Sequence, residues 1–477
     1  MLVALWMLGN LRWIRWDHLV RDGDEEGHVG AAELFLAELS SSQWIAVVER
    51  AWWGDMGEYP PGYAAFVGAW WWLTGVGQPS EVAVRGIGLF WILLAALATA
   101  RLGSRRDSQA ALLAGCLVLV LPLCVGLGRH FMPEGALIAA VSVSVLMGVR
   151  ASERPTPGRA LGLGLVLGLG LMVKQTFLLV GLVPTVWAGR RLGRQGVWAV
   201  VVAGLVAGPW YLAQWSDQLD YASASASNHG SGGLWGHLVY YPVVAGWYGL
   251  GPVLLAALVL VLWVGRQHAV GERSARDREL WMLGWVWFLG ALLLLGLVPK
   301  KYPRLLAPAL PGLVLVLSVG VARIQARKRL SVALVTAGGA WLVWVSSVQL
   351  PVPTMVSGVD PGCLQSWIRP AVATDLALGE VAEITRSSAT GPVRVHGAPE
   401  IACEVQTTHP WLDHLGPYLR RAGVEREIQV VERSEDLAGA AVAISWDGAP
   451  SNHGDWEHEQ MVPVDTLGRV MWIGSLR

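Results

Sequence analysis

Long apolar runs alternate with short polar segments over the first 350 residues, and most runs approach the length that crosses a bilayer. Their length and sparse internal charge favour helices over buried strands. We expect about eleven membrane spans, near residues 1–16, 82–100, 109–127, 133–149, 160–173, 176–188, 196–213, 241–265, 280–298, 304–322 and 331–350. The pattern therefore predicts a polytopic α-helical membrane protein.

After residue 350 the pattern becomes that of a soluble protein. The segment "PVPTMVSGVDPG" is typical of a linker, and "HPWLDHLGPYLRRAG" has helical spacing that ends at a glycine. Four further segments have the composition of strands: "PVRVHG", "REIQVV", "AAVAISW" and "RVMWIGSL". We predict two domains, a membrane domain over residues 1–350 and a small extracytoplasmic α/β domain over residues 351–477.

Arginine clusters in alternate loops predict the orientation of the spans. By the positive-inside rule these loops are cytoplasmic, so the loop over residues 17–81 and the C-terminal domain lie outside. We expect a multi-pass protein of the cell (inner or plasma) membrane, N-in and C-out. The first span begins at Met1 and carries Arg12 and Arg15, which indicates a start further upstream or a partial span. The five clusters are Arg101, Arg105 and Arg106; Arg150, Arg154 and Arg159; Arg190, Arg191 and Arg194; Arg266, Arg273, Arg276 and Arg278; and Arg323, Arg327, Lys328 and Arg329.

Composition agrees with this class of protein. Hydrophobic residues make up 53% of the chain, the mean hydropathy is +0.45 and the net charge is zero, so no nucleic-acid partner is indicated. Cys363 and Cys403 lie in the predicted outer domain, where they could form a disulfide or remain free. Cys116 and Cys124 fall in a span and are predicted to be small apolar fillers.

Polar residues collect in the predicted outer segments. The long outer loop opens with "RDGDEEGHVG" and reaches "GEYPPGY", and the next outer turn is "GLGRHFMPEG". Cations at the outer turns run against the positive-inside bias, so they predict an anionic ligand that compensates their charge. A glycosyl phosphate fits, because its leaving phosphate needs cations and its acceptor needs a carboxylate base. The predicted phosphate-binding cations are Arg129, Lys174, Lys301 and Arg304.

The order of "DEEGHVGAAELFLAELSSSQW", "EYPPGY", "GRHFMPEG", "GLGLMVKQTFLL" and "KKYPRLLAPALP" resembles the GT-C glycosyltransferases, specifically bacterial relatives of protein O-mannosyltransferases and of the lipid A aminoarabinose transferase. This resemblance, over about residues 1–325, implies inverting transfer of a sugar from a polyprenyl-phosphate donor to an extracytoplasmic lipid, glycan or protein. It maps the general base onto Asp24, with Glu25 beside it, and the second acidic residue onto Glu134. The acceptor or structural loop is Glu58, Tyr59, Pro60 and Pro61.

Two departures from that pattern affect what it implies. Tyr59 stands where the aminoarabinose transferases have Lys, and Glu134 stands where Asp is common. The donor sugar and the use of a divalent metal are therefore left open, and no cofactor is indicated with certainty. The four histidines of the outer segments, His28, His130, His229 and His237, have no spacing typical of metal ligands.

Structural roles and other functions are alternatives at each of these positions. The acidic loop residues can be solvated, Glu58 and Glu134 can cap or complement helix starts, and the cations can reach lipid head groups. A secondary transporter would show ionisable residues at mid-span and an internal repeat, and the sequence shows neither. A membrane scaffold that presents the C-terminal domain is the third alternative, and it predicts that Asp24 is dispensable.

Overall fold

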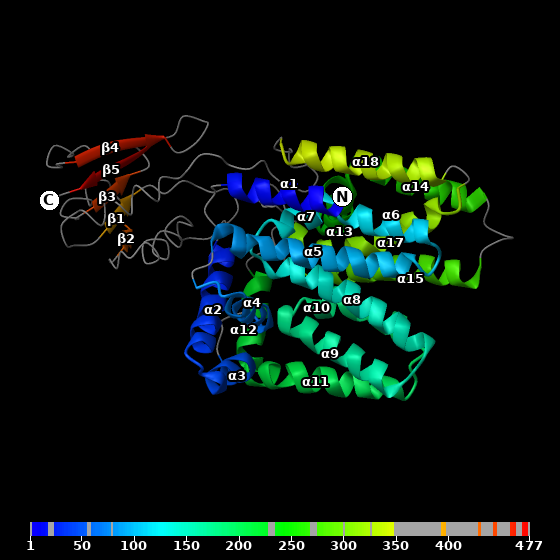
Figure 1. Cartoon of the computed structure of the whole chain (residues 1–477), viewed down its shortest axis with the longest axis horizontal. Coiled ribbons are helices and arrows are strands. Elements are labelled where there is room, and N and C mark those ends of the chain that lie inside the picture. Colours follow the sequence, from blue (N-terminus) through cyan, green and yellow to red (C-terminus); the bar gives the residue numbers. More distant parts are fainter. Residues whose placement is uncertain are drawn as a thin grey trace. The chain divides into compact units, whose positions relative to one another are not determined.

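The structure is a computed structural model, and it describes residues 2–17, 23–54, 59–77, 80–227, 234–267, 274–298, 301–324 and 327–347, together with five strand segments near the C-terminus. The chain divides into two compact units. One unit comprises Met1–Ile14 and His28–Pro370, and it contains the helical bundle (Figure 1). The other comprises Arg15–Gly27 and Ala371–Arg477, and it contains the strands.

The described helices account for every segment that the sequence predicts as a span. Their bounds are α1 Leu2–Trp16, α2 Gly23–Ser40, α3 Trp44–Trp53, α4 Gly62–Thr74, α5 Glu81–Gly103, α6 Ser108–Val118, α7 Pro122–Gly128, α8 Pro133–Glu153, α9 Pro157–Val173, α10 Phe177–Gly189, α11 Gln195–Ala213, α12 Trp215–Ser227, α13 Leu234–Val244, a π-helix Ala245–Leu250, α14 Gly251–Gln267, α15 Ala275–Leu297, α16 Pro303–Leu306, a 3₁₀ turn Ala307–Ala309, α17 Leu310–Val321 and α18 Arg327–Val345.

Fewer helices than the eleven predicted spans have the length and hydropathy typical of a membrane crossing. Among the described residues six helices are long and apolar enough to cross a membrane, or seven if α6 and α7, bent by 60°, form one span. The prediction of eleven is therefore not confirmed. Four predicted spans have no match among these candidates. Three are short helices: α1, α9 and α10 have 15, 17 and 13 residues, below the roughly 20 that a typical span needs. The fourth, α18, has 19 residues but begins with three cations, Arg327, Lys328 and Arg329. The finding that remains is a multi-pass membrane protein.

Helix α17 lies at the centre of the bundle, and every one of its residues is buried. It packs closely against α15, where glycines let the two backbones approach. A Cβ on Gly284 would lie 2.7 Å from the carbonyl oxygen of Gly312. Glycine is required on both helices at this crossing, because any side chain would force them apart.

Prolines and polar caps set the helix starts around the bundle. Pro133 and Pro303 occupy the first turns of α8 and α16, where a missing N–H costs nothing. Ser80 caps α5 by accepting a hydrogen bond from the N–H of Ala83 at 3.3 Å. These signals fix where α8 and α16 begin, and both helices carry candidate site residues in that first turn.

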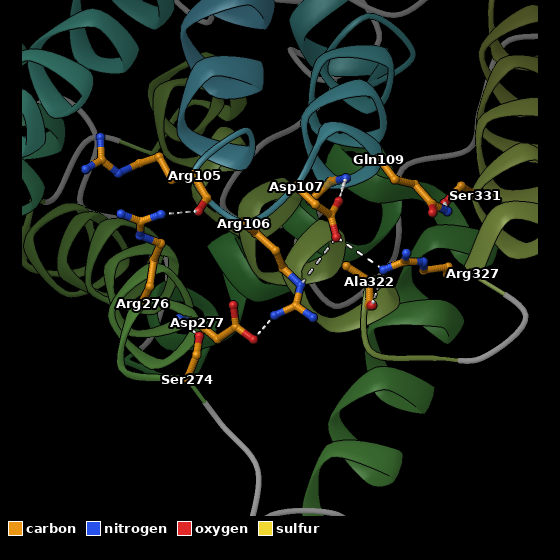
Figure 2. Close-up of polar contacts among 11 residues, drawn as sticks. Arg105, Arg106, Asp107, Gln109, Ser274, Arg276, Asp277, Ala322, Arg327 and Ser331 are labelled. Atoms are coloured by element: carbon orange, nitrogen blue, oxygen red, sulfur yellow. Dashed lines mark hydrogen bonds and ion pairs between the residues drawn. The ribbon is translucent and has the colours of Figure 1, made fainter.

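Ion pairs join the five arginine-rich loops at one end of the bundle. Figure 2 shows three of these loops, which carry Arg106, Asp277 and Arg327. Arg106 pairs with Asp277 at the start of α15, and Arg327 of α18 lies 3.2 Å from Asp107. The prediction that all five loops are cytoplasmic requires them to lie at one end of the bundle, and they do. That this end faces the cytoplasm remains a prediction. Further contacts among the described parts of these loops include the ion pairs Arg105–Glu153, Arg190–Glu279 and Arg191–Glu279 and the hydrogen bond that Arg276 donates to the carbonyl of Arg105.

The C-terminal strands form one mixed sheet in the order β2-β1-β3-β5-β4. Strand β1 is parallel to β2 and β3, and β5 is antiparallel to β3 and β4. Each of the four predicted strand segments contains a strand, and β4 was not predicted. The predicted helix over residues 409–423, Cys363 and Cys403 lie outside the described residues, so the α/β domain as a whole stays a prediction. The strand bounds are β1 Val393–His396, β2 Ile428–Val430, β3 Val442–Ser445, β4 His458–Pro463 and β5 Val470–Ser475.

Candidate active site

A buried ion cluster forms around Glu134, whose side chain is fully excluded from solvent. The Nζ of Lys174 donates a hydrogen bond to Oε1 of Glu134 at 2.6 Å, and the Nε of Arg304 lies 3.5 Å from the same oxygen. Lys174 and Arg304 are themselves 4% and 7% exposed. A carboxylate buried this deeply is stable only beside cations, so three predicted site residues come together here.

The local chain direction explains how this cluster forms. Glu134 lies in the first turn of α8, directly after Pro133, and Lys174 ends α9 in an extended conformation. Arg304 follows Pro303 in the first turn of α16. Three segments far apart in sequence therefore bring one side chain each to the same place. The Oε2 atom of Glu134 has no hydrogen-bond partner among the described residues.

An aromatic pair borders the cluster. The Lys174 ammonium lies 4.9 Å from the centroid of the Tyr59 ring, and the ring of His28 packs edge-on against Tyr59 at 4.8 Å. His28 belongs to α2 and is 7% exposed. A continuous series of contacts thus runs from α2 through the loop before Pro60 to Lys174 and Glu134.

Arg129, another predicted phosphate ligand, lies in a different set of contacts. Its Nε donates to Oδ1 of Asn10 at 2.7 Å, and its Nη1 donates to Oγ of Ser346 at 2.8 Å. The guanidinium also lies 4.8 Å from the Trp13 ring. Arg129 therefore joins the first and last helices of the bundle to the turn before α8. Its binding of phosphate stays a prediction.

Lys301 follows α15, four residues beyond its last residue, Leu297. Its Nζ donates to the carbonyls of Leu295 and Gly296, at 2.9 Å and 3.0 Å, and to that of Val298. These are orphan acceptors of a helix C-terminus, which a lysine satisfies well. Burial lowers the pKa of Lys301 to about 8. Its ammonium also lies 5.4 Å from the Tyr241 ring.

The acidic motif of the first outer loop begins helix α2. Asp24 and Glu25 lie in the first turn of this helix, where carboxylates complement the helix dipole, and Glu25 is buried. Glu58 lies outside the described residues. Pro60 and Pro61 are buried, and Pro61 caps the start of α4.

Sequence reasoning missed several residues that contact the predicted cations. Asn10, Trp13 and Ser346 gave no signal, because an ordinary polar or aromatic residue in an apolar helix has many uses. A signal did exist for the tyrosines: Tyr59, Tyr241 and Tyr302 each directly precede a proline. Their rings lie against Lys174, Lys301 and Arg304, the last pair at 4.9 Å. As for metals, the part of the chain that the structure describes holds no group of three or more His, Cys, Asp or Glu side chains able to bind one.

Comparisons with known proteins agree with this architecture. Residues 59–211 match the family model of dolichyl-phosphate-mannose-protein mannosyltransferases. The crystal structure of ArnT from Cupriavidus metallidurans bound to undecaprenyl phosphate is similar, with a TM-score of 0.58 and 16% identity over 99% of this chain and 97% of that one. The chain has the GT-C fold.

Two further GT-C structures are similar. ArnT in the apo state gives a TM-score of 0.56 and 17% identity over 99% of this chain and 97% of that one. The archaeal oligosaccharyltransferase AglB from Archaeoglobus fulgidus, in complex with an inhibitory peptide and a dolichol-phosphate, gives a TM-score of 0.52 and 9% identity over 93% of this chain and 69% of that one. No curated protein matches the sequence. The family match and the structural likenesses to ArnT and AglB confirm the resemblance to the GT-C superfamily.

Proposed function

We propose that this chain is a membrane glycosyltransferase that moves a sugar from a polyprenyl-phosphate donor to an acceptor on the extracytoplasmic side. The observation that supports it most is the buried cluster of Glu134, Lys174 and Arg304. It gathers two cations in a water-poor place, where they act strongly on a phosphate. The similar ArnT structure holds undecaprenyl phosphate, and the AglB structure holds a dolichol-phosphate.

In the proposed reaction a hydroxyl or amine of the acceptor attacks the anomeric carbon of the donor sugar. The bond from that carbon to the phosphate oxygen breaks, and its electron pair leaves with the phosphate. Asp24 takes the acceptor's proton. Direct displacement inverts the anomeric configuration, because no covalent glycosyl-enzyme forms. The acceptor and the identity of the sugar are not assigned.

The cations have the task of stabilising the charge that builds on the leaving phosphate. Lys174 and Arg304 are proposed as the principal pair, and Arg129 and Lys301 as further cations of the same outer turns. Glu134 acts by holding Lys174 and Arg304 charged and in place. Tyr59, Pro60 and Pro61 shape the loop beside them, and Glu25 supports the start of α2.

We also propose an orientation and domain bounds. The outer end of the bundle and the C-terminal domain lie on the extracytoplasmic face of the cell membrane. The membrane domain extends over residues 1–350 and the C-terminal domain over residues 351–477.

The deciding experiment replaces the proposed base. Asp24→Asn keeps the shape of the side chain but cannot accept a proton, so turnover should fall about 100-fold or more while donor binding persists. Asp22→Asn is the matched control two residues earlier, and its effect should be milder. The assay follows sugar release from a polyprenyl-phosphate sugar in the presence of an acceptor fraction. Full activity of Asp24→Asn would remove the base from the mechanism.

A further inference from the structure

Tyrosine rings accompany three of the four cations proposed to bind phosphate. Each of these tyrosines precedes a proline, and the chain has no other Tyr–Pro dipeptide. The pairs are Tyr59 with Lys174, Tyr302 with Arg304 and Tyr241 with Lys301, at 4.9, 4.9 and 5.4 Å from ring centroid to cation. Two of the three pairs, those of Tyr59 and Tyr302, border the same carboxylate, Glu134.

A ring face differs from a carboxylate in what it does to a cation. The negative face of the aromatic ring attracts the cation electrostatically, and the attraction grows when water is excluded. The ring carries no net charge, however, so the positive charge of Lys174 or Arg304 is not cancelled by it. A ring can therefore fix the position of a cation and leave its charge to act on an incoming anion.

Both tyrosines at Glu134 have further contacts: Tyr302 packs against the buried core, and the ring of Tyr59 contacts that of His28. Tyr302 is extended, with φ −129° and ψ 138°, as expected for a residue before proline. Tyr59 precedes Pro60, and the ring of His28 packs against it. A cation that rests on such a ring has little freedom, and preorganised charge is what stabilises a developing anion most.

We propose that Tyr59 and Tyr302 are positioning residues, whose ring faces hold Lys174 and Arg304 at Glu134 and thereby set the affinity of this site for the phosphate group of the donor. The proposal rests on the proposed function for its ligand. Neither tyrosine touches the reacting atoms in this role; each acts through the cation that it carries.

The test measures the affinity of the full-length protein for undecaprenyl phosphate in detergent. Tyr59→Leu and Tyr302→Leu should each weaken binding by about 2- to 30-fold, the range that follows from one lost cation–ring contact. Tyr59→Phe and Tyr302→Phe should restore most of the affinity, because they keep the ring and lose only the hydroxyl. Tyr211→Leu is the matched control. Its hydroxyl donates to the carbonyl of Leu171 at 3.0 Å, near the end of α9, and among the described residues its ring carries no cation.

Leucine variants that bind like Tyr211→Leu, or phenylalanine variants as weak as the leucine ones, would overturn the role of the rings. A second measurement needs no ligand. In a double-mutant cycle on Tm, Tyr59→Leu and Lys174→Met should be non-additive, because the ring contact can be lost only once. Additivity would contradict the contact itself. If the wild-type protein shows no affinity for undecaprenyl phosphate, the proposed function and its ligand fail, while the Tm cycle still decides whether ring and cation are coupled.

Discussion

The Nζ of Lys174 and the Oε1 of Glu134 lie 2.6 Å apart in the interior of the protein, although 40 residues separate them in the chain. This pair joins the end of α9 to the start of α8. An ion pair without access to water depends on both partners, since either one left alone is a buried unpaired charge.

We therefore expect Glu134→Gln to destabilise the protein by about 3–5 kcal/mol, the usual cost of removing one partner from a buried ion pair. Lys174 and Arg304 would then lack the carboxylate between them. Thermal unfolding in detergent measures the effect. Glu153→Gln is the control on the same helix, because its pairing with Arg105 is 42% exposed on the Glu153 side and is worth about 0–1 kcal/mol. Equal effects of the two variants would contradict the burial argument.

The contacts of Arg129 give a second prediction. Ser346→Ala removes the acceptor of its Nη1 and leaves a buried charged group with one hydrogen bond fewer, so Tm should fall by an amount equivalent to about 1–3 kcal/mol. Ser347→Ala is a close control. Among the described residues the Ser347 hydroxyl, just beyond the end of α18, donates to the carbonyl of Val343 at 2.8 Å and makes no contact with Arg129. The link between α18 and the turn before α8 would be unimportant if the two variants had the same Tm.

Lys301 should produce opposite pH trends in affinity and stability. Burial lowers its pKa from 10.5 to about 8, so the ammonium loses its proton as the pH rises through about 8. Affinity for undecaprenyl phosphate should then decrease over that range if Lys301 contributes charge to the site.

The stability of the protein should follow the opposite trend. In the unfolded chain the Lys301 ammonium keeps its proton up to about pH 10.5. The penalty for burying the charge is therefore complete below pH 8 and disappears towards pH 10.5, which makes the folded state relatively more stable as the pH rises. Titration of binding and of Tm tests both trends, and Lys301→Met should flatten both. A wild-type protein whose affinity does not change between pH 7 and 9 would remove Lys301 from the phosphate site.

The orientation is testable with single cysteines. A cysteine at Ser223 should react with an impermeant maleimide from outside intact cells, and one at Arg191 only after the membrane is opened. Both residues are exposed in the bundle unit, so access and not burial decides the result. Labelling of Arg191→Cys from outside would reverse the predicted sidedness.

Helix positions were the most predictable part of this fold, because the Arg, Gly and Pro residues beside each apolar run mark where the helix begins and ends. Every predicted span coincides with a helix. The count of spans is not confirmed where the runs are short: Pro157–Val173 and Phe177–Gly189 are apolar helices below typical spanning length. The hydropathy of such a run does not show whether its helix crosses the whole bilayer.

The candidate site was predictable as a set of residues but not as a geometry. Glu134, Lys174 and Arg304 stood out as charges at the edges of apolar runs, and they meet. Arg129 and Lys301 stood out for the same reason, yet their described contacts include Asn10 and Ser346 for Arg129, helix-end carbonyls for Lys301, and an aromatic ring for each. The sequence does not distinguish the cations that contact Glu134 from those that contact other groups. An arginine that folding places beside a carboxylate and one that it places beside a serine have the same kind of neighbours along the chain.

Helix α17 is as hydrophobic as a helix that faces lipid, yet its side chains contact protein and not lipid. All twelve residues from Leu310 to Val321 are surrounded by protein. The substitutions that this helix tolerates are therefore limited by side-chain volume and not by hydrophobicity. Gly312→Leu would satisfy any hydropathy scale, but a Cβ there already comes within 2.8 Å of the Gly284 carbonyl oxygen, whereas Leu293 on α15 is 68% exposed and has room for a larger side chain.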